Sequence, residues 1–264
     1  MIEACEQNKL RERFNPDGSL LRQHQLRMLD MLKYIDGICR KYDIQYWLCS
    51  GTLIGAVRHG GFIPWDDDVD IEMLREDYMK FVEIMMNEEP QNDYILQTHD
   101  TDSGYFYPYG KLRDLHSKLD ETNPFDNFRY RGVYIDIFVM EHSSSLILSR
   151  VSAIIHGKLI PVFVQQNKFS NLLYNLVHKG LFSVFRAMAK ITSRGNLRHA
   201  LGTYFFKGRK EKDIFPLKRM KFEDSDFYVP SDPDAYLTKI YGDYMKLPDV
   251  DKIRTHVIKL ELYS

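Results

Sequence analysis

Acidic residues are concentrated in one short stretch of the chain, WDDDVDI, which spans residues 65–71. Four carboxylates fall within five positions, and the last two, Asp68 and Asp70, begin the alternating segment DVDIEM. Alternation of acidic and apolar residues is typical of a strand with one polar face. We therefore expect Asp68 and Asp70 to point the same way and to share a hard divalent cation through oxygen ligands. Taken alone, the acidic run is also compatible with a solvated turn.

Another carboxylate stands alone in a later apolar segment, GVYIDIFVM, at residues 132–140. The segment is typical of a buried strand, and burial of Asp136 there requires a partner or a metal to compensate for lost hydration. Asp136 is thus a candidate third metal ligand or the base that takes the proton from an attacking hydroxyl. The alternative is a structural Asp held by hydrogen bonds.

A predicted helix, residues 52–59, follows a predicted strand, residues 45–49, and opens at the pair Gly51-Thr52. The free N–H groups of such a helix start can bind phosphate, and glycine lets the phosphate approach the backbone. A simple tight turn would explain Gly51 as well. The order of strand, Gly-Thr, helix, Asp-x-Asp strand and later Asp strand is the layout of a nucleotidyltransferase-type site, where carboxylates hold magnesium against nucleotide phosphates.

Three cations near these motifs are candidate ligands for a donor phosphate. Lys111 and Arg113 are two apart in a predicted strand, residues 107–113, and should point the same way. Arg58 stands at the end of the Gly-Thr helix. The alternative for each is an ordinary surface charge, since Lys and Arg are usually exposed.

Helices and strands alternate around these motifs. Apolar spacing predicts helices over residues 20–42 and 75–89 and one opening at Pro233. Further strands are expected at residues 94–98 and 132–139. For Trp65 we favour a role in the core or in anchoring the loop, because large aromatics beside active sites are more often packing residues.

The segment from residue 146 to 212 differs from the rest in charge. It holds twelve Lys or Arg and one acid, Glu211, for a net charge of +11, whereas the remainder of the chain carries -12. Its helical spacing predicts a basic helical insertion. Such helices could be plain surface, could lie on anionic lipid, or could bind an anionic glycan or its lipid-linked diphosphate; we favour a mixture of the last two.

Composition narrows the class of protein. The net charge of the 264 residues is -1, which gives no indication of a nucleic-acid partner. Three scattered cysteines are too few for a disulfide framework, and the charged first residues do not read as a secretory signal. We therefore expect a cytoplasmic protein.

The motifs SGTLIGAVRHGGFIPWDDDVDI, YGKLRD, GVYIDIF and YGDYMKLP together resemble the LicD family. That family comprises phosphocholine transferases of bacterial surface glycans, with fukutin-type ribitol-phosphate transferases as distant kin. The resemblance covers residues from about 20 to 141 and about 215 to 250. It implies an α+β fold: a nucleotidyltransferase-like mixed β-sheet flanked by helices, here with the basic helical insertion.

The resemblance also implies an activity. The expected reaction moves a phospho-alcohol, foremost phosphocholine, from a CDP-activated donor to a hydroxyl of a surface glycan, such as lipopolysaccharide or teichoic acid, or of its lipid-linked precursor. The resemblance implies a divalent metal, and Asp68, Asp70 and Asp136 are the candidate ligands for Mg²⁺ or Mn²⁺. A peripheral position on the inner face of the cell membrane is expected from the basic helices and a lipid-linked acceptor, not from the resemblance. Nucleotide transfer from an NTP with release of pyrophosphate, and a non-catalytic metal-containing binding protein, are the alternatives.

The predicted organisation has three parts. Residues 1–143 form the catalytic core, residues 144–213 the basic insertion with membrane or acceptor contact, and residues 214–264 complete the core.

Overall fold

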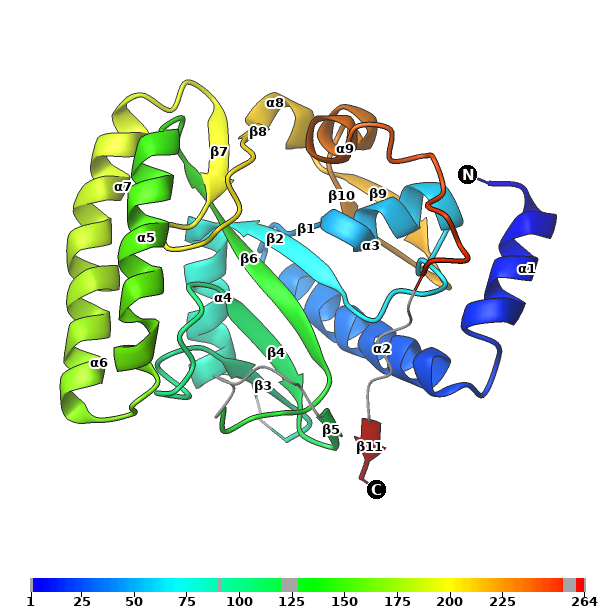
Figure 1. Cartoon of the computed structure of the whole chain (residues 1–264), viewed down its shortest axis with the longest axis horizontal. Coiled ribbons are helices and arrows are strands. Elements are labelled where there is room, and N and C mark those ends of the chain that lie inside the picture. The colour runs from blue at the N-terminus through cyan, green and yellow to red at the C-terminus, as the bar shows by residue number, and fades with distance from the viewer. Residues whose placement is uncertain (1, 90–91, 120–127, 254–259, 264) are drawn as a thin grey trace.

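The computed structural model describes residues 2–89, 92–119, 128–253 and 260–263, and a mixed sheet forms its centre (Figure 1). The strand order is β1-β2-β6-β4-β3, with β7 beside the end of β6 and β8 beside β7. Strands β2 and β6 are parallel, and their other neighbours are antiparallel. The strands are β1 (Trp47–Leu48), β2 (Asp70–Leu74), β3 (Tyr94–Gln97), β4 (Gly110–Asp114), β6 (Tyr134–His142), β7 (Asn196–His199) and β8 (Arg209–Lys210). The expected mixed sheet flanked by helices is confirmed.

Two small antiparallel pairs lie outside this sheet. They are β9 (Lys218–Phe222) with β10 (Ser225–Val229), and β5 (Ser117–Leu119) with β11 (Leu260–Leu262). The helices before the basic segment are α1 (Ala4–Phe14), α2 (Leu20–Lys41), α3 (Ser50–Ile54), its π-helical continuation η1 (Gly55–His59) and α4 (Arg75–Asn87). Near the C-terminus come α8 (Glu211–Ile214) and α9 (Pro233–Tyr241).

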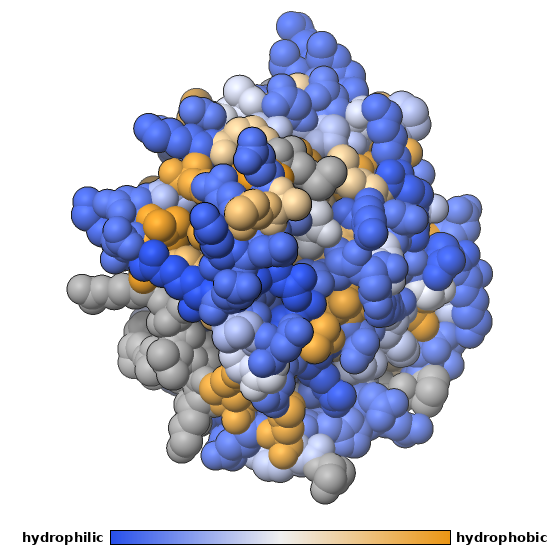
Figure 2. All heavy atoms as spheres, turned by 90° about the vertical axis from the view of Figure 1, so that its right-hand side faces the viewer, coloured by the Kyte–Doolittle hydropathy of each residue, from blue (hydrophilic) through white to orange (hydrophobic). Residues whose placement is uncertain are grey.

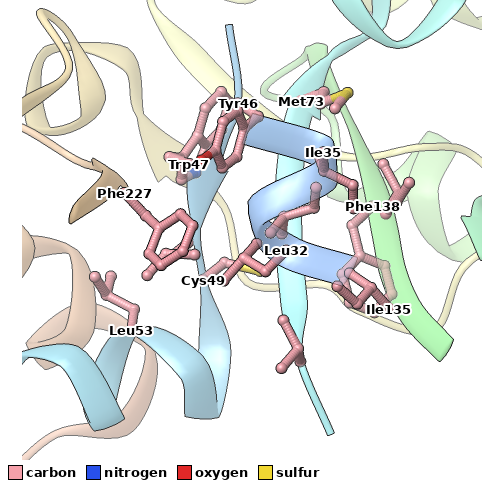
Figure 3. Packing of buried hydrophobic residues seen from close by; sticks show 14 of the residues in the cluster. Leu32, Ile35, Tyr46, Trp47, Cys49, Leu53, Met73, Ile135, Phe138 and Phe227 are labelled. Carbon is pink, nitrogen blue, oxygen red and sulfur yellow. The ribbon is translucent and has the colours of Figure 1, made fainter. Parts of the chain in front are cut away.

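Alternation along β2 and β6 gives the sheet two unlike faces. Apolar residues such as Ile71 and Ile135 are fully buried on the face that α2 and α4 cover. Leu32 and Ile35 of α2 lie close to Ile135 in this core (Figure 3). The residues in between, which include Asp70, therefore belong to the opposite face. The main core thus supports the sheet from one side and leaves the other side for chemistry.

The predicted helix over residues 20–42 is confirmed as α2. Ser19 caps its first turn by accepting a hydrogen bond from the backbone N–H of Arg22 at 3.2 Å. Its buried residues recur at helical spacing, as expected. Leu26, three residues before the buried Leu29, is 44% exposed, because the buried side of α2 lies beside it.

Other boundaries differ from the predictions. β2 begins at Asp70, so Asp68 lies in the preceding loop and the expectation of one shared strand face is wrong for it. β4 begins at Gly110 rather than at residue 107. The residues before it, including Tyr105 and Phe106, are buried in a separate aromatic cluster instead of a strand pair.

The segment predicted as a basic insertion contains a layer of helices at one side of the molecule (Figure 1). These are α5 (Leu146–Phe163), α6 (Lys168–Asn175), the π-helical η2 (Leu176–Leu181) and α7 (Phe182–Ile191). The segment then returns to the sheet as β7 and β8. Its last part therefore belongs to the central sheet. The parts of the predicted core at residues 120–127 and 254–259 lie outside the described residues.

Candidate active site

The register of the two parallel strands brings two predicted catalytic residues together. Asp70 of β2 is the direct partner of Asp136 of β6, and the backbone N–H of Asp136 donates to the carbonyl of Val69 at 3.0 Å. Paired residues of neighbouring strands share a face, so the two carboxylates lie next to each other. Asp66 and Asp68 reach the same place from the preceding loop. All four carboxylates line one cavity of about 810 Å³.

The Gly-Thr pair shapes this cavity in two ways. A Cβ added at Gly51 would lie 2.7 Å from Oδ2 of Asp66, so any larger residue there would push this carboxylate out of its place. Thr52 is buried, and its Oγ1 accepts the backbone N–H of Asp70 at 2.8 Å. Gly51 lines the cavity, whereas Thr52 fixes the start of β2 below it.

Burial and, after it, the crowding of like charges determine the electrostatics of the site. Burial, followed by the charges of Asp68 and Asp136, raises the pKa of Asp70 well above its usual value. Burial and the neighbouring Asp68 do the same for the pKa of Asp66. The Nζ atom of Lys111, 2.7 Å from Oδ1 of Asp136, partly offsets this crowding. Converging carboxylate oxygens with too little positive charge fit a hard divalent cation.

A divalent cation would need ligands beyond these side chains. Across the described part of the chain, no three His, Cys, Asp or Glu residues form a group arranged to hold a metal ion by themselves. Mg²⁺ in phosphoryl-transfer sites is commonly bound by one or two carboxylates together with substrate phosphates and water. Asp68 and Asp70 fit that kind of shared coordination.

The predicted cationic ligands are held by the protein instead of facing the cavity. Lys111 and Arg113 point the same way, because both lie over the ring of Tyr134. The Nζ atom of Lys111 is 3.5 Å and the Cζ atom of Arg113 is 4.5 Å from the ring centroid. Arg113 is fully buried and donates to Oε1 of Gln97 and to a backbone carbonyl. Arg58 is buried as well and donates to the carbonyl of Tyr244 at 2.7 Å.

Trp65 anchors the acidic loop, as favoured from the sequence. Its ring packs edge-on against Phe14 and His59, with centroids at 5.3 and 5.9 Å. It is not among the residues that line the cavity.

The far wall of the cavity comes from a part of the chain that the sequence reasoning did not connect with the acids. It consists of Lys207, Arg209, the aromatic run Tyr204–Phe206, and Tyr241 of α9. The segment GTYFFKGRK, residues 202–210, is rich in aromatic and basic residues, and this composition is the signal that sequence reasoning passed over. The pairing of β7 with β6 and of β8 with β7 brings this segment back to the sheet beside the acids.

Comparison with known proteins agrees with these features. Residues 43–152 match the family model described as LicD/FKTN/FKRP, nucleotidyltransferase domain. The chain is 31% identical over 265 residues to the lipopolysaccharide cholinephosphotransferase LicD of Haemophilus influenzae, covering 90% of this chain and 96% of that protein. The chain belongs to the LicD family.

More distant relatives share parts of the chain. An uncharacterized protein of Rickettsia prowazekii is 26% identical over 221 residues, which is 84% of this chain and 56% of that protein. The human ribitol 5-phosphate transferase FKRP is 47% identical over 45 residues, 17% of this chain and 9% of that protein. LicD is a family of transferases, so the expectation of an enzyme is confirmed.

In this LicD-family chain, a buried network joins the two walls of the site. Glu72 is fully buried, and its carboxylate accepts hydrogen bonds from Arg209 at 3.0 Å, Trp47 at 2.8 Å and Tyr236 at 2.7 Å. Burial alone would raise the pKa of Glu72, but the charge of Arg209 and these bonds outweigh it and lower the pKa. Burial and Arg209 lower the pKa of His199 to about 3, so its neutral ring also accepts from Arg209, at 3.0 Å.

We predict that Glu72→Gln lowers the free energy of unfolding by about 3–5 kcal/mol, because it leaves the buried Arg209 charge without its partner. Urea denaturation at neutral pH measures the change. Since the folded-state pKa of Glu72 is lowered, the difference from wild type should narrow as the pH falls below about 4. The control is Asp249→Asn, whose pair with Lys252 is exposed and should contribute at most about 1 kcal/mol. Equal losses in the two variants would contradict the role of the network.

Proposed function

We propose that this protein transfers phosphocholine from CDP-choline to a hydroxyl of a cell-surface glycan or its lipid-linked precursor, with Mg²⁺ or Mn²⁺ as cofactor. The observation that carries the proposal is one cavity lined by paired carboxylates together with cationic and aromatic side chains. The similarity to a lipopolysaccharide cholinephosphotransferase over nearly the whole chain supports it. With a soluble nucleotide donor, the proposed reaction takes place on the cytoplasmic side.

Asp68 and Asp70 are the proposed metal ligands. A divalent cation held there would neutralise the donor diphosphate and the charge that grows on the leaving CMP. Lys207 reaches the cavity from the other wall, where its Nζ donates to the carbonyl of Ile240. Its positive charge would attract the anionic donor into the site, whereas the charge of Arg209 is paired with Glu72.

Asp136 is the proposed base or a third metal ligand. As base, it takes the proton of the acceptor hydroxyl while that oxygen bonds to the phosphorus of phosphocholine and the bond from phosphorus to CMP breaks. Lys111, paired to Oδ1 of Asp136 at 2.7 Å, orients this carboxylate. The proton passes to Asp136, and CMP leaves with the bonding electrons.

Nucleotide transfer from an NTP is the second candidate, because the matching family model is described as a nucleotidyltransferase domain. It would use the same carboxylates but would release pyrophosphate. Two relatives named as transferases of cholinephosphate and ribitol 5-phosphate favour phospho-alcohol transfer.

We predict that ³¹P NMR with Mg²⁺ and CDP-choline shows CMP and phosphocholine formed slowly by transfer to water, and no pyrophosphate from CTP. Asp68→Ala and Asp70→Ala should each lower this rate at least about a hundredfold, since each removes charge stabilisation at the reacting phosphate. Both variants should melt no lower than wild type, because each relieves repulsion. The matched control is Asp67→Ala, next to Asp68 but outside the cavity lining. Its rate of transfer to water should stay within about threefold of the wild-type rate. Wild-type rates in either cavity variant would refute the assignment, and pyrophosphate from CTP would move the protein to nucleotide transfer.

The aromatic wall of the cavity suits a quaternary ammonium group. Tyr109, Phe138 and Phe205 follow one another along it, with ring centroids 4.7 Å and 5.4 Å apart, and Tyr241 lines the same cavity. Ring faces attract cations that are weakly hydrated, as trimethylammonium is. A neutral polyol such as ribitol gains no such attraction, so this wall favours choline as the transferred alcohol.

We predict that CDP-choline binds about tenfold more tightly than its neutral 3,3-dimethylbutyl analogue, in which carbon replaces nitrogen, because only the cation interacts with the ring faces. Phe205→Ala should reduce this preference, whereas Tyr263→Ala, an exposed tyrosine outside the cavity, should leave it unchanged. Isothermal titration calorimetry with Mg²⁺ measures both ligands. Equal affinity for the two in wild type would show that the wall does not select choline by its charge.

A further inference from the structure

The helices α5, α6, η2 and α7 expose an unusual number of large apolar side chains. Ile147, Phe169, Leu172 and Ile191 are 74%, 66%, 67% and 85% exposed. Others exposed on these helices are Val151, Ile154, Leu176, Leu181, Val184 and Met188. We call this outer surface of the four helices the helical face. An apolar surface of this extent on a soluble protein marks an interaction site.

Positive charge accompanies these apolar side chains. Residues 146–191 contain six Lys or Arg and no Asp or Glu. Arg150, Lys158, Lys168 and Lys190 are exposed among the apolar residues of the face. The opposite end of the molecule, which carries α1, is mostly hydrophilic with small separate apolar patches (Figure 2). Apolar and cationic side chains interleaved on one face are typical of helices that lie on anionic lipid.

We propose that the helical face docks on an anionic membrane surface, with its apolar side chains in the headgroup region and its cations against lipid phosphates. Phosphates and acidic headgroups supply the negative charge that this part of the protein lacks. The proposal concerns where the protein works and does not depend on which donor it uses.

The helices lie on the bilayer in this arrangement and do not cross it. α5 is the one helix among the described residues that is long and apolar enough to span a membrane. Its inner side, however, is hydrogen-bonded to the rest of the protein. Oγ of Ser152 accepts the backbone N–H of Gly202 at 3.0 Å, and Nδ1 of His156 lies 3.0 Å from Nε2 of His178. Crossing a bilayer would place these polar groups in hydrocarbon and break the contacts.

A second copy of the chain is a poorer occupant of the helical face. Two copies meeting through it would bring together cations from both with no acid from residues 146–191 to pair with them. Like charges across a contact oppose association. A bilayer containing anionic lipid has the complementary charge.

The rim of the active-site cavity touches the helical layer. The hydroxyl of Tyr204, which lines the cavity, occupies the space beside Gly157 of α5, where a Cβ would have no room. Gly157 lies next to the exposed stripe of that helix, between Ile154 and Lys158. Docking would therefore place the cavity mouth near the lipid surface. If the proposed function holds, an acceptor attached to a lipid could reach the site without leaving the membrane.

The test is co-sedimentation of the full chain with vesicles of phosphatidylcholine alone and vesicles that also contain phosphatidylglycerol. We expect at least about tenfold stronger binding to the anionic vesicles, weakened at about 1 M salt, where charges are screened. The variant Ile154→Asp/Leu172→Asp/Met188→Asp should lose this binding at least about tenfold. No donor or turnover is needed, so failure here is separate from failure of the proposed reaction.

The matched control is Leu20→Asp/Leu26→Asp/Met86→Asp, which adds the same charge at exposed apolar positions of α2 and α4. Its binding to the anionic vesicles should stay within about twofold of that of wild type. Should the first variant melt below wild type, Arg150→Ser/Lys158→Ser/Lys190→Ser replaces it and should lose the preference for anionic lipid. The proposal would be overturned if wild type did not bind vesicles, or if the apolar variant and its control lost binding equally. It would also be overturned if sedimentation velocity showed a dimer that only the helical-face variant dissociates.

Discussion

Two carboxylates, Asp70 and Asp136, occupy directly paired positions on parallel strands, and the rest of the site is built around the repulsion between them. Burial strengthens that repulsion, because little water is left to screen it. The sheet cannot relieve it by shifting register, since the apolar residues on either side are packed against α2 and α4. Lys111 offsets part of this negative charge, and a bound cation or protons can neutralise the rest.

The neighbouring acid on the same strand shows what a compensated carboxylate looks like. Glu72 is two residues from Asp70 and on the same face, yet its pKa is lowered whereas that of Asp70 is raised. The difference lies in their surroundings: Glu72 has Arg209 and two hydrogen-bond donors, and Asp70 has other carboxylates. One acid ties β2 to β8 and α9, and the other remains available for chemistry. This division of roles supports a catalytic assignment for Asp70 and a structural one for Glu72.

Local sequence patterns were enough to predict much of the central fold. The alternation in DVDIEM and the lone acid in GVYIDIF predicted two strands and the acids that their register pairs. The same patterns placed Asp68 in a strand that begins only at Asp70, because alternation does not show where pairing starts. Arg58 and Arg113 read as phosphate ligands, since nothing local revealed that the fold buries them against carbonyl and amide groups.

The far wall of the cavity depends on contacts between distant segments. Arg209 meets Glu72 across 137 positions of sequence, and Tyr241 reaches the cavity from α9. No periodicity of the sequence indicates such a contact. The motifs therefore predicted the acidic wall of the cavity, whereas its cationic and aromatic wall was found only in the structure. The helical layer was likewise predicted from charge and spacing, while the exposure of its apolar side chains needed the fold.

The most direct test of this account is Mn²⁺ binding, followed by electron paramagnetic resonance of the free ion, in wild type and in the isosteric variant Asp70→Asn. The account predicts that wild type binds Mn²⁺ more tightly when CDP-choline is present, because metal and diphosphate complete each other's coordination. It also predicts that Asp70→Asn binds at least about tenfold more weakly while melting no lower than wild type, since it removes a ligand and a repulsive charge together. Unchanged Mn²⁺ affinity in the variant, or a large fall in its melting temperature, would contradict the claim that crowded carboxylates form the metal site.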